Sequence, residues 1–203
     1  MGKPGKPRTR GRRTSSPTAD RILLEAQIAE AMRDLTVRHR QKDAHWKLRL
    51  MGPVARPAVE EGLFADDAEL RVQCTLLIDH LAGNDSFELM LLLLDDPDPR
   101  VRQHAMHALA CDRCKADDVC ALPAREIIDA AAGVLQRDPQ PHVRAIALEA
   151  LARWMHSDDG ARRALASAAS DDPSPYIRKK ASWYLPGGKT YERTRSRVES
   201  REW

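Results

Sequence analysis

A phrase of eight residues recurs three times in this chain and constrains its fold more than any other feature. The copies at 95–102, 137–144 and 171–178 each contain Asp-Pro-x-Pro-x-(Val/Ile)-Arg. Each copy is followed by an alanine four positions after the Val or Ile, and by a leucine four positions later. A phrase that recurs at such intervals is typical of a repeat array, in which each unit buries its apolar face against its neighbours.

The two prolines of the phrase predict the corner of a helical hairpin. Proline fixes its own φ, cannot continue a preceding helix, and is tolerated in the first turn of the next one. Beyond that corner, Val101, Ala105 and Leu109 lie at i, i+4 and i+8, so they share one face of a helix. Ala105 is small enough to let a neighbouring helix approach closely.

Weaker copies extend the array toward the N-terminus. Residues 66–71 form a degenerate copy with Cys74 in the small position, and residues 43–49 form a weaker one with Gly52 in that position. Only 4% of the residues are aromatic, which favours helix pairs over a sandwich or a barrel. We therefore predict an all-α protein without a sheet, an α-solenoid of about four to five helical hairpins.

The phrase resembles the HEAT repeat, specifically the short bacterial HEAT-like repeats related to those of phycobilin lyases, over roughly residues 40–185. The resemblance implies that the repeated Asp and Arg form a ladder between adjacent repeats. That role would fall to Arg71, Arg102, Arg144 and Arg178. The alternative for these residues is an arginine stripe that binds nucleic acid, although residues repeated in every unit usually serve the stack itself.

In HEAT arrays the second helices usually line the concave side, where partners bind. We therefore expect a partner surface on the second helices, with apolar anchors inside a polar rim. Its residues are Gln73, Leu76, Gln103, His104, Ile146, Glu149, Lys179, Lys180 and Trp183. For Trp183, capping of the last repeat is the alternative. This surface predicts a non-catalytic scaffold or adaptor that binds another protein, and not an enzyme.

A cysteine-rich insertion at 111–122 interrupts the repeats. Cys-x2-Cys is the spacing of a zinc knuckle, and a histidine one turn earlier completes a set of four ligands for one structural zinc ion. The predicted ligands are His107, Cys111, Cys114 and Cys120, with His104 in reserve. Three alternatives remain: free or redox-active thiols, a disulfide within the cluster (Cys111–Cys114 or Cys114–Cys120), or histidines that are simply solvated.

Charge divides the chain into three parts. Residues 1–19 carry bases and no acid, namely Lys3, Lys6, Arg8, Arg10, Arg12 and Arg13. We expect this basic arm to be disordered, residues 20–185 to form the repeat domain, and residues 186–203 to be a charged, frayed tail. The arm is the candidate site for the alternative function, association with nucleic acid, although such tails often only aid solubility. The chain has no apolar leader or spanning segment, so we expect it to be cytoplasmic.

Two enzymatic alternatives rest on the fold alone. The repeats are similar to those of phycobilin lyases, which would make the chain a lyase-type enzyme or enzyme subunit. Some HEAT-like proteins are DNA glycosylases that use aromatic residues and an Asp, for which Trp154 and Asp158 are the candidates here. Asp158 lies in a turn before a predicted helix, where capping is the ordinary role of an aspartate.

Overall fold

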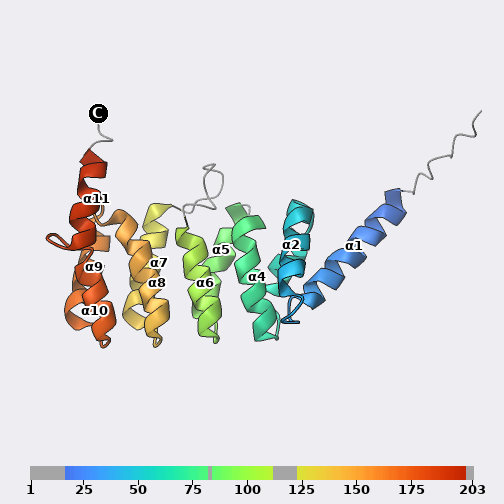
Figure 1. The fold of residues 1–203 in the computed structure, drawn as a ribbon, viewed down its shortest axis with the longest axis horizontal. Helices are drawn as coiled ribbons and strands as arrows, with labels where there is room; N and C mark the ends of the chain where they lie inside the picture. The colour runs from blue at the N-terminus through green and yellow to red at the C-terminus, as the bar shows by residue number, and fades with distance from the viewer. Residues whose placement is uncertain (1–16, 82–83, 112–122, 200–203) are drawn as a thin grey trace, which may run out of the picture.

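The computed structural model describes residues 17–81, 84–111 and 123–199, and within these ranges it contains helices and no strand. The helices pair into five antiparallel hairpins that stand side by side in one row (Figure 1). The pairs are α1 (Pro17–Asp34) with α2 (Gln41–Met51), α3 (Arg56–Gly62) with α4 (Ala68–Leu81), α5 (Asn84–Leu92) with α6 (Pro99–Ala110), α7 (Ala124–Arg137) with α8 (Pro141–Leu151), and α9 (Asp159–Asp171) with α10 (Pro175–Ser182). The predicted all-α solenoid is confirmed.

The repeated phrase forms the corner of each of the last three hairpins. Pro99, Pro141 and Pro175 are the first residues of α6, α8 and α10, where the missing N–H costs no hydrogen bond. The aspartate three residues before each of these prolines also shapes the corner, because its carboxylate accepts a hydrogen bond from the backbone N–H of the residue two positions later. For Asp138 this donor is the N–H of Gln140, at 2.8 Å.

The second helices of the hairpins contribute one continuous side of the core. α4, α6, α8 and α10 pack in sequence, each beside the next. In α6 the predicted stripe of Val101, Ala105 and Leu109 is completely buried. The small position of the other repeats is buried as well, with Cys74, Ala147 and Ala181. This position keeps the two layers of helices close together.

The arginines form the ladder that the HEAT resemblance implied. Each guanidinium makes two hydrogen bonds to an aspartate at the next corner, and its remaining nitrogen donates to carbonyl oxygens at its own corner. The rungs are Arg71–Asp96, Arg102–Asp138 and Arg144–Asp172. Arg178 differs: it donates to the backbone oxygen of Asp172, and the sequence contains no later aspartate.

Two local predictions are wrong. Gly52 is not the small core residue of the first repeat, because it caps α2 with a φ of 60°. The buried small residue of α2 is Ala44. The expected frayed tail also contains a helix, α11 (Lys189–Glu199), which packs against the last hairpins through the 4.4 Å ring contact between His156 and Tyr191.

Candidate functional site

Two of the four predicted zinc ligands, His107 and Cys111, lie close together, and Asp79 of α4 joins them. A carboxylate oxygen of Asp79, a ring nitrogen of His107 and the sulfur of Cys111 all lie within 4.8 Å of one another. His107 is in the last turn of α6, and Cys111 is the residue that ends this helix. Cys114 and Cys120 fall in 112–122, outside the described residues.

Two other potential ligands are not part of this cluster. His104 is half-buried on α6, and burial lowers its pKa below the ordinary value, with smaller electrostatic contributions from His107 and Arg100. Cys74 lies in the core, where burial raises the pKa of its thiol to about 12. A thiol that stays protonated is a packing group and a poor metal ligand.

The predicted partner residues lie on the outer faces of the second helices, which we call the second-helix surface. They are not equally accessible. Leu76, Glu149 and Lys179 are exposed, whereas Gln73, Gln103, His104, Ile146, Lys180 and Trp183 are half-buried. The structure thus leaves an open surface at some of these positions and uses others in contacts between neighbouring helices.

A polar network joins α2, α4 and α6 across this surface. Gln41 and Gln73 both donate to Glu69, at 2.9 and 2.8 Å, and Arg100 pairs with the same carboxylate at 2.7 Å. The hydrogen bond from Gln73 is the main reason that the pKa of Glu69 is lowered. His45 completes the network through a 2.7 Å hydrogen bond to Gln73. These contacts fix the spacing of the three helices.

The C-terminal end of the surface is closed by similar contacts. Lys180 of α10 pairs with Glu149 of α8 and lies over the ring of Tyr176. Trp183 is covered on one side by Lys189, whose ammonium lies 3.4 Å from the centre of the ring. Lys189 therefore leaves less of the Trp183 ring available to a partner.

Two exposed apolar residues at the N-terminal end, Trp46 and Leu50, were not included in the predicted partner surface, whereas their neighbour Leu76 was. Trp46 and Leu50 of α2 are 60% and 69% exposed, and Leu76 of α4 is 36% exposed. Trp46 comes two residues after buried Ala44, and Leu76 comes two residues after buried Cys74, so the two side chains occupy equivalent positions on adjacent helices. Because the register of α2 was predicted from Gly52, Trp46 was not placed on this surface. We call Trp46, Leu50 and Leu76 the apolar patch.

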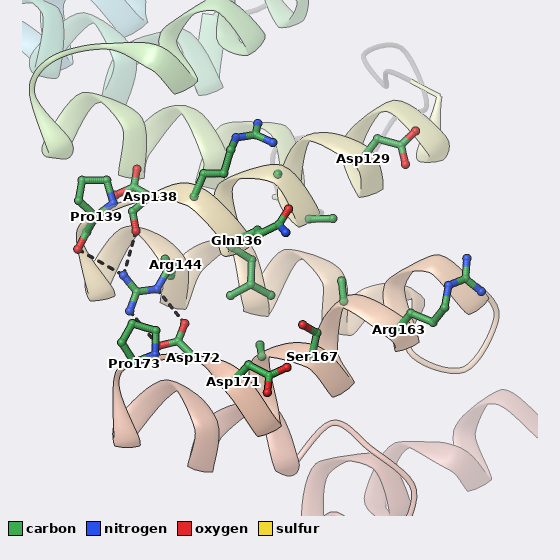
Figure 2. A pocket seen from close by; sticks show the side chains of 16 residues that line it. Asp129, Gln136, Asp138, Pro139, Arg144, Arg163, Ser167, Asp171, Asp172 and Pro173 are labelled. Carbon is green, nitrogen blue, oxygen red and sulfur yellow. Dashed lines mark hydrogen bonds and ion pairs between the residues drawn. The ribbon is translucent and has the colours of Figure 1, made fainter.

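A groove with a volume of about 780 Å3 lies on the other layer of helices, between α7 and α9 (Figure 2). Small residues open it, including Gly133, Ala164 and Ser167. One end of the groove is charged and is formed by a rung of the arginine ladder, where Arg144 donates hydrogen bonds to the Asp172 carboxylate and to the backbone oxygen of Asp138 (Figure 2). The groove therefore reflects the spacing of the repeats, and its buried ions already satisfy one another.

The remaining predictions concern the termini and the glycosylase alternative. The basic arm from Lys3 to Arg13 lies outside the described residues. Asp158 caps α9 by accepting the backbone N–H of Ala161 at 2.8 Å, which is the structural role predicted for it. Across the described residues, no helix combines the length and the apolar character that a bilayer-spanning segment needs.

Comparison with solved structures shows that this fold is similar to that of a chain from a lyase complex. One chain in the complex of CpcE and CpcF of phycocyanin lyase from Nostoc sp. PCC7120 is similar with a TM-score of 0.62 and 13% identity, over 78% of this chain and 98% of that one. An engineered protein is similar with a TM-score of 0.44 and 18% identity, over 76% of each chain. No family model and no curated protein matches the sequence. The similarity establishes a HEAT-like helical fold.

This similarity corrects the expectation that the chain is not an enzyme. That expectation rested on a repeat array with no recognisable catalytic group. The CpcE and CpcF structure shows that a lyase is built on the same kind of helical array. The expectation of no enzymatic activity is therefore wrong as an inference from this fold.

Proposed function

We propose that this chain is a HEAT-like subunit of a lyase-type assembly and that it binds its partner protein through the apolar patch. The observation that carries the proposal is the exposure of Trp46, Leu50 and Leu76 on two adjacent second helices. Exposed apolar side chains that gather in one place are typical of protein interaction sites. Tryptophan at the centre of such a patch is among the residues that contribute most to binding free energy.

The polar network supports this proposal because it holds the patch in place. His45 and Gln41 of α2 bond to Gln73 and Glu69 of α4, so the two helices that carry the apolar side chains are joined by hydrogen bonds. A surface that is rigid before binding loses less conformational entropy when the partner arrives. The array thus presents the patch in one fixed arrangement.

The charges around the patch favour a partner with an acidic rim. Lys42, Lys47 and Arg49 are exposed on α2, against the single exposed acid Asp43 of that helix. Opposite charges across an interface speed association and select among partners. The similar lyase structure is itself a complex of two proteins, CpcE and CpcF, which supports a partner protein for this chain too.

Site-specific photo-cross-linking in the producing cells tests the binding surface. A photo-reactive phenylalanine at position 46 should trap one protein of defined mass, and Leu50→Ser or Leu76→Ser should reduce that product. The matched control carries the same group at Arg125, an exposed residue of α7 on the opposite layer. An identical set of products from positions 46 and 125, or none from position 46, would contradict the proposed surface.

The lyase-type role is tested separately, with the trapped partner added. The purified chain and its partner should change the absorbance of a bilin together, and Trp46→Ala should abolish that change because the assembly fails to form. A variant at Arg125 should leave the signal intact. No change in bilin absorbance with a stably formed complex would reject the lyase-type role while preserving the binding surface.

A further inference from the structure

We propose that Asp79, His107 and Cys111 form a metal site for a zinc ion, one that links the second helices of two adjacent repeats. Asp79 belongs to α4, whereas His107 and Cys111 belong to α6 and its C-terminal end. α4 and α6 pack side by side, so the site lies at their contact. This ligand set differs from the one that the cysteine spacing predicted, because its third member comes from another repeat.

The distances between the three ligand atoms fit tetrahedral coordination of a metal ion after a small adjustment. With zinc bonds of about 2.0–2.3 Å, ligand atoms in a tetrahedral site lie roughly 3.3–3.8 Å apart. The three ligand atoms here lie within 4.8 Å of one another. The difference is at most about 1 Å to 1.5 Å, a shift of the size that side-chain rotations produce. The two helices therefore already hold the ligands in place.

The chemistry of the three groups selects the kind of metal. A thiolate and an imidazole suit zinc and similar borderline cations, whereas calcium and magnesium prefer oxygen ligands alone. The carboxylate oxygen Oδ1 of Asp79 is buried, and a bound cation would interact favourably with the negative charge of this group. When zinc binds, Cys111 releases its proton to solvent. One carboxylate and one thiolate then balance the two charges of the ion.

The site has a structural consequence for the surface nearby. Asp79 lies one turn after Leu76 on α4, so the ion would fix that part of the helix against α6. Three protein ligands leave one position of the tetrahedron for a further ligand or for water. The site is thus open enough for a metal ion to enter and for a chelator to remove that ion.

Cobalt and zinc binding to the full, reduced chain test the proposal. Cobalt should give the visible absorption of a tetrahedral site and a thiolate-to-cobalt band that Cys111→Ser removes. Asp79→Asn keeps the size of the side chain and should weaken zinc binding more than about tenfold. Loss of a residue that only hydrogen-bonds to a metal ligand already lowers metal affinity about 10–100-fold. His104→Ala is the matched control, since His104 lies on the same helix outside the cluster, and it should leave affinity unchanged.

The double variant Cys114→Ser/Cys120→Ser separates this site from one built in the insertion. If Asp79, His107 and Cys111 hold the ion, this variant retains cobalt binding and its thiolate band. Loss of binding in this variant, together with unchanged affinity in Asp79→Asn, would overturn the proposal. Failure of the wild-type chain to bind either metal would overturn it as well. Far-UV circular dichroism of each variant verifies that the helices remain folded.

Discussion

Arg102 and Asp138 join consecutive repeats through a two-pronged ion pair that is almost completely shielded from water. Nε of Arg102 donates to Oδ2 of Asp138 at 2.6 Å, and Nη2 donates to Oδ1 at 3.0 Å. The third guanidinium nitrogen donates to the backbone oxygen of Asp96 at 2.8 Å. One side chain therefore fixes both the corner of its own repeat and the position of the next.

The first prediction is that Asp138→Ala destabilises the array severely. The change leaves the buried Arg102 without its counter-charge, and breaking one side of a buried ion pair costs about 3–5 kcal/mol. The free energy of unfolding, measured by urea denaturation, should fall by that amount. The matched control is Arg178→Ala at the end of the ladder, where no aspartate follows, and it should cost about 1 kcal/mol, the usual value of one hydrogen bond.

A paired replacement separates the charge effect from packing. Replacing a buried ion pair by apolar residues of similar volume is often neutral. Arg102→Met combined with Asp138→Leu should therefore be more stable than Asp138→Ala alone. If the double variant were equally unstable, the ion pair would not be the source of the loss.

The second prediction is that the array loses stability at low pH. Burial opposes ionisation of Asp138 and Asp172, but the hydrogen bonds from Arg102 and Arg144 and from backbone N–H groups outweigh it and lower both pKa values. Because these pKa values are lower in the folded state, their contribution to stability is complete above the unfolded value of about 3.9 and is lost as pH falls through the folded value.

Urea denaturation between pH 7 and pH 2.5 checks this prediction. The free energy of unfolding should decrease with acidification below about pH 4, where the unfolded chain binds protons that the folded chain does not. The slope should be shallower in Asp138→Asn, which cannot titrate. Equal slopes in the two proteins would mean that Asp138 has the same pKa in both states.

The repeated phrase predicted the hairpins because each residue in it has a local role. Pro99, Pro141 and Pro175 begin their helices as expected, and the Asp and Arg positions form the ladder. The degenerate copy at 66–71 was also assigned correctly, with Cys74 buried and Arg71 paired with Asp96, but the assignment failed in the weakest copy, at 43–49. The small position of α2 was assigned to Gly52, a glycine that ends the helix, instead of to Ala44, and no residue of this weak copy was included in the predicted partner surface.

The Asp79 contact illustrates a second limit. The spacing of His107 and Cys111 indicates that both lie on one helix face, which sequence periodicity reveals. Asp79 precedes them by nearly one repeat and meets them only because α4 and α6 pack in a particular register. Side chains contributed by a neighbouring helix carry no spacing signal in the sequence, so this cluster required the structure.

The third prediction tests the small position of the second hairpin. A Cβ at Gly62 would lie 2.5 Å from Sγ of Cys74 and 2.9 Å from Cε of Met32. Gly62→Ala should therefore push α3 away from α4 and cost about 1–3 kcal/mol, the usual penalty for overpacking. Thermal denaturation measures the loss, and Cys74→Ala in the same chain should recover part of it by removing the sulfur.

Gly133→Ala provides the matched control for Gly62→Ala. The atoms nearest to its Cβ would belong to the end of the Arg137 side chain, at 2.8 Å from Nη2, and that flexible group can move aside. Alanine is also the better helix former by about 1 kcal/mol. Gly133→Ala should be neutral or stabilising, and a loss as large as that of Gly62→Ala would show that helix position, not the Cys74 contact, decides the effect.

The fourth prediction is that Gly188→Ala releases α11 from the end of the array. A Cβ at Gly188 would lie 2.7 Å from the backbone carbon of Trp183, and a backbone group cannot rotate away as a side chain can. The turn there is held by the Gly188 N–H to Leu185 oxygen bond at 2.7 Å and by Thr190 and Tyr191 N–H groups that both donate to the Trp183 oxygen. Opening this turn also removes the His156–Thr194 hydrogen bond.

Amide hydrogen exchange at 189–195 should therefore become much faster in Gly188→Ala, while exchange in α6 and α8 stays as in the unmodified chain. The neighbouring Gly187→Ala is the control, because a Cβ there meets no atom within 4 Å and only the positive φ of 82° opposes it. That strain amounts to about 1–2 kcal/mol, since alanine disfavours the left-handed region. If Gly187→Ala and Gly188→Ala released α11 equally, turn strain and not the clash with Trp183 would control its docking.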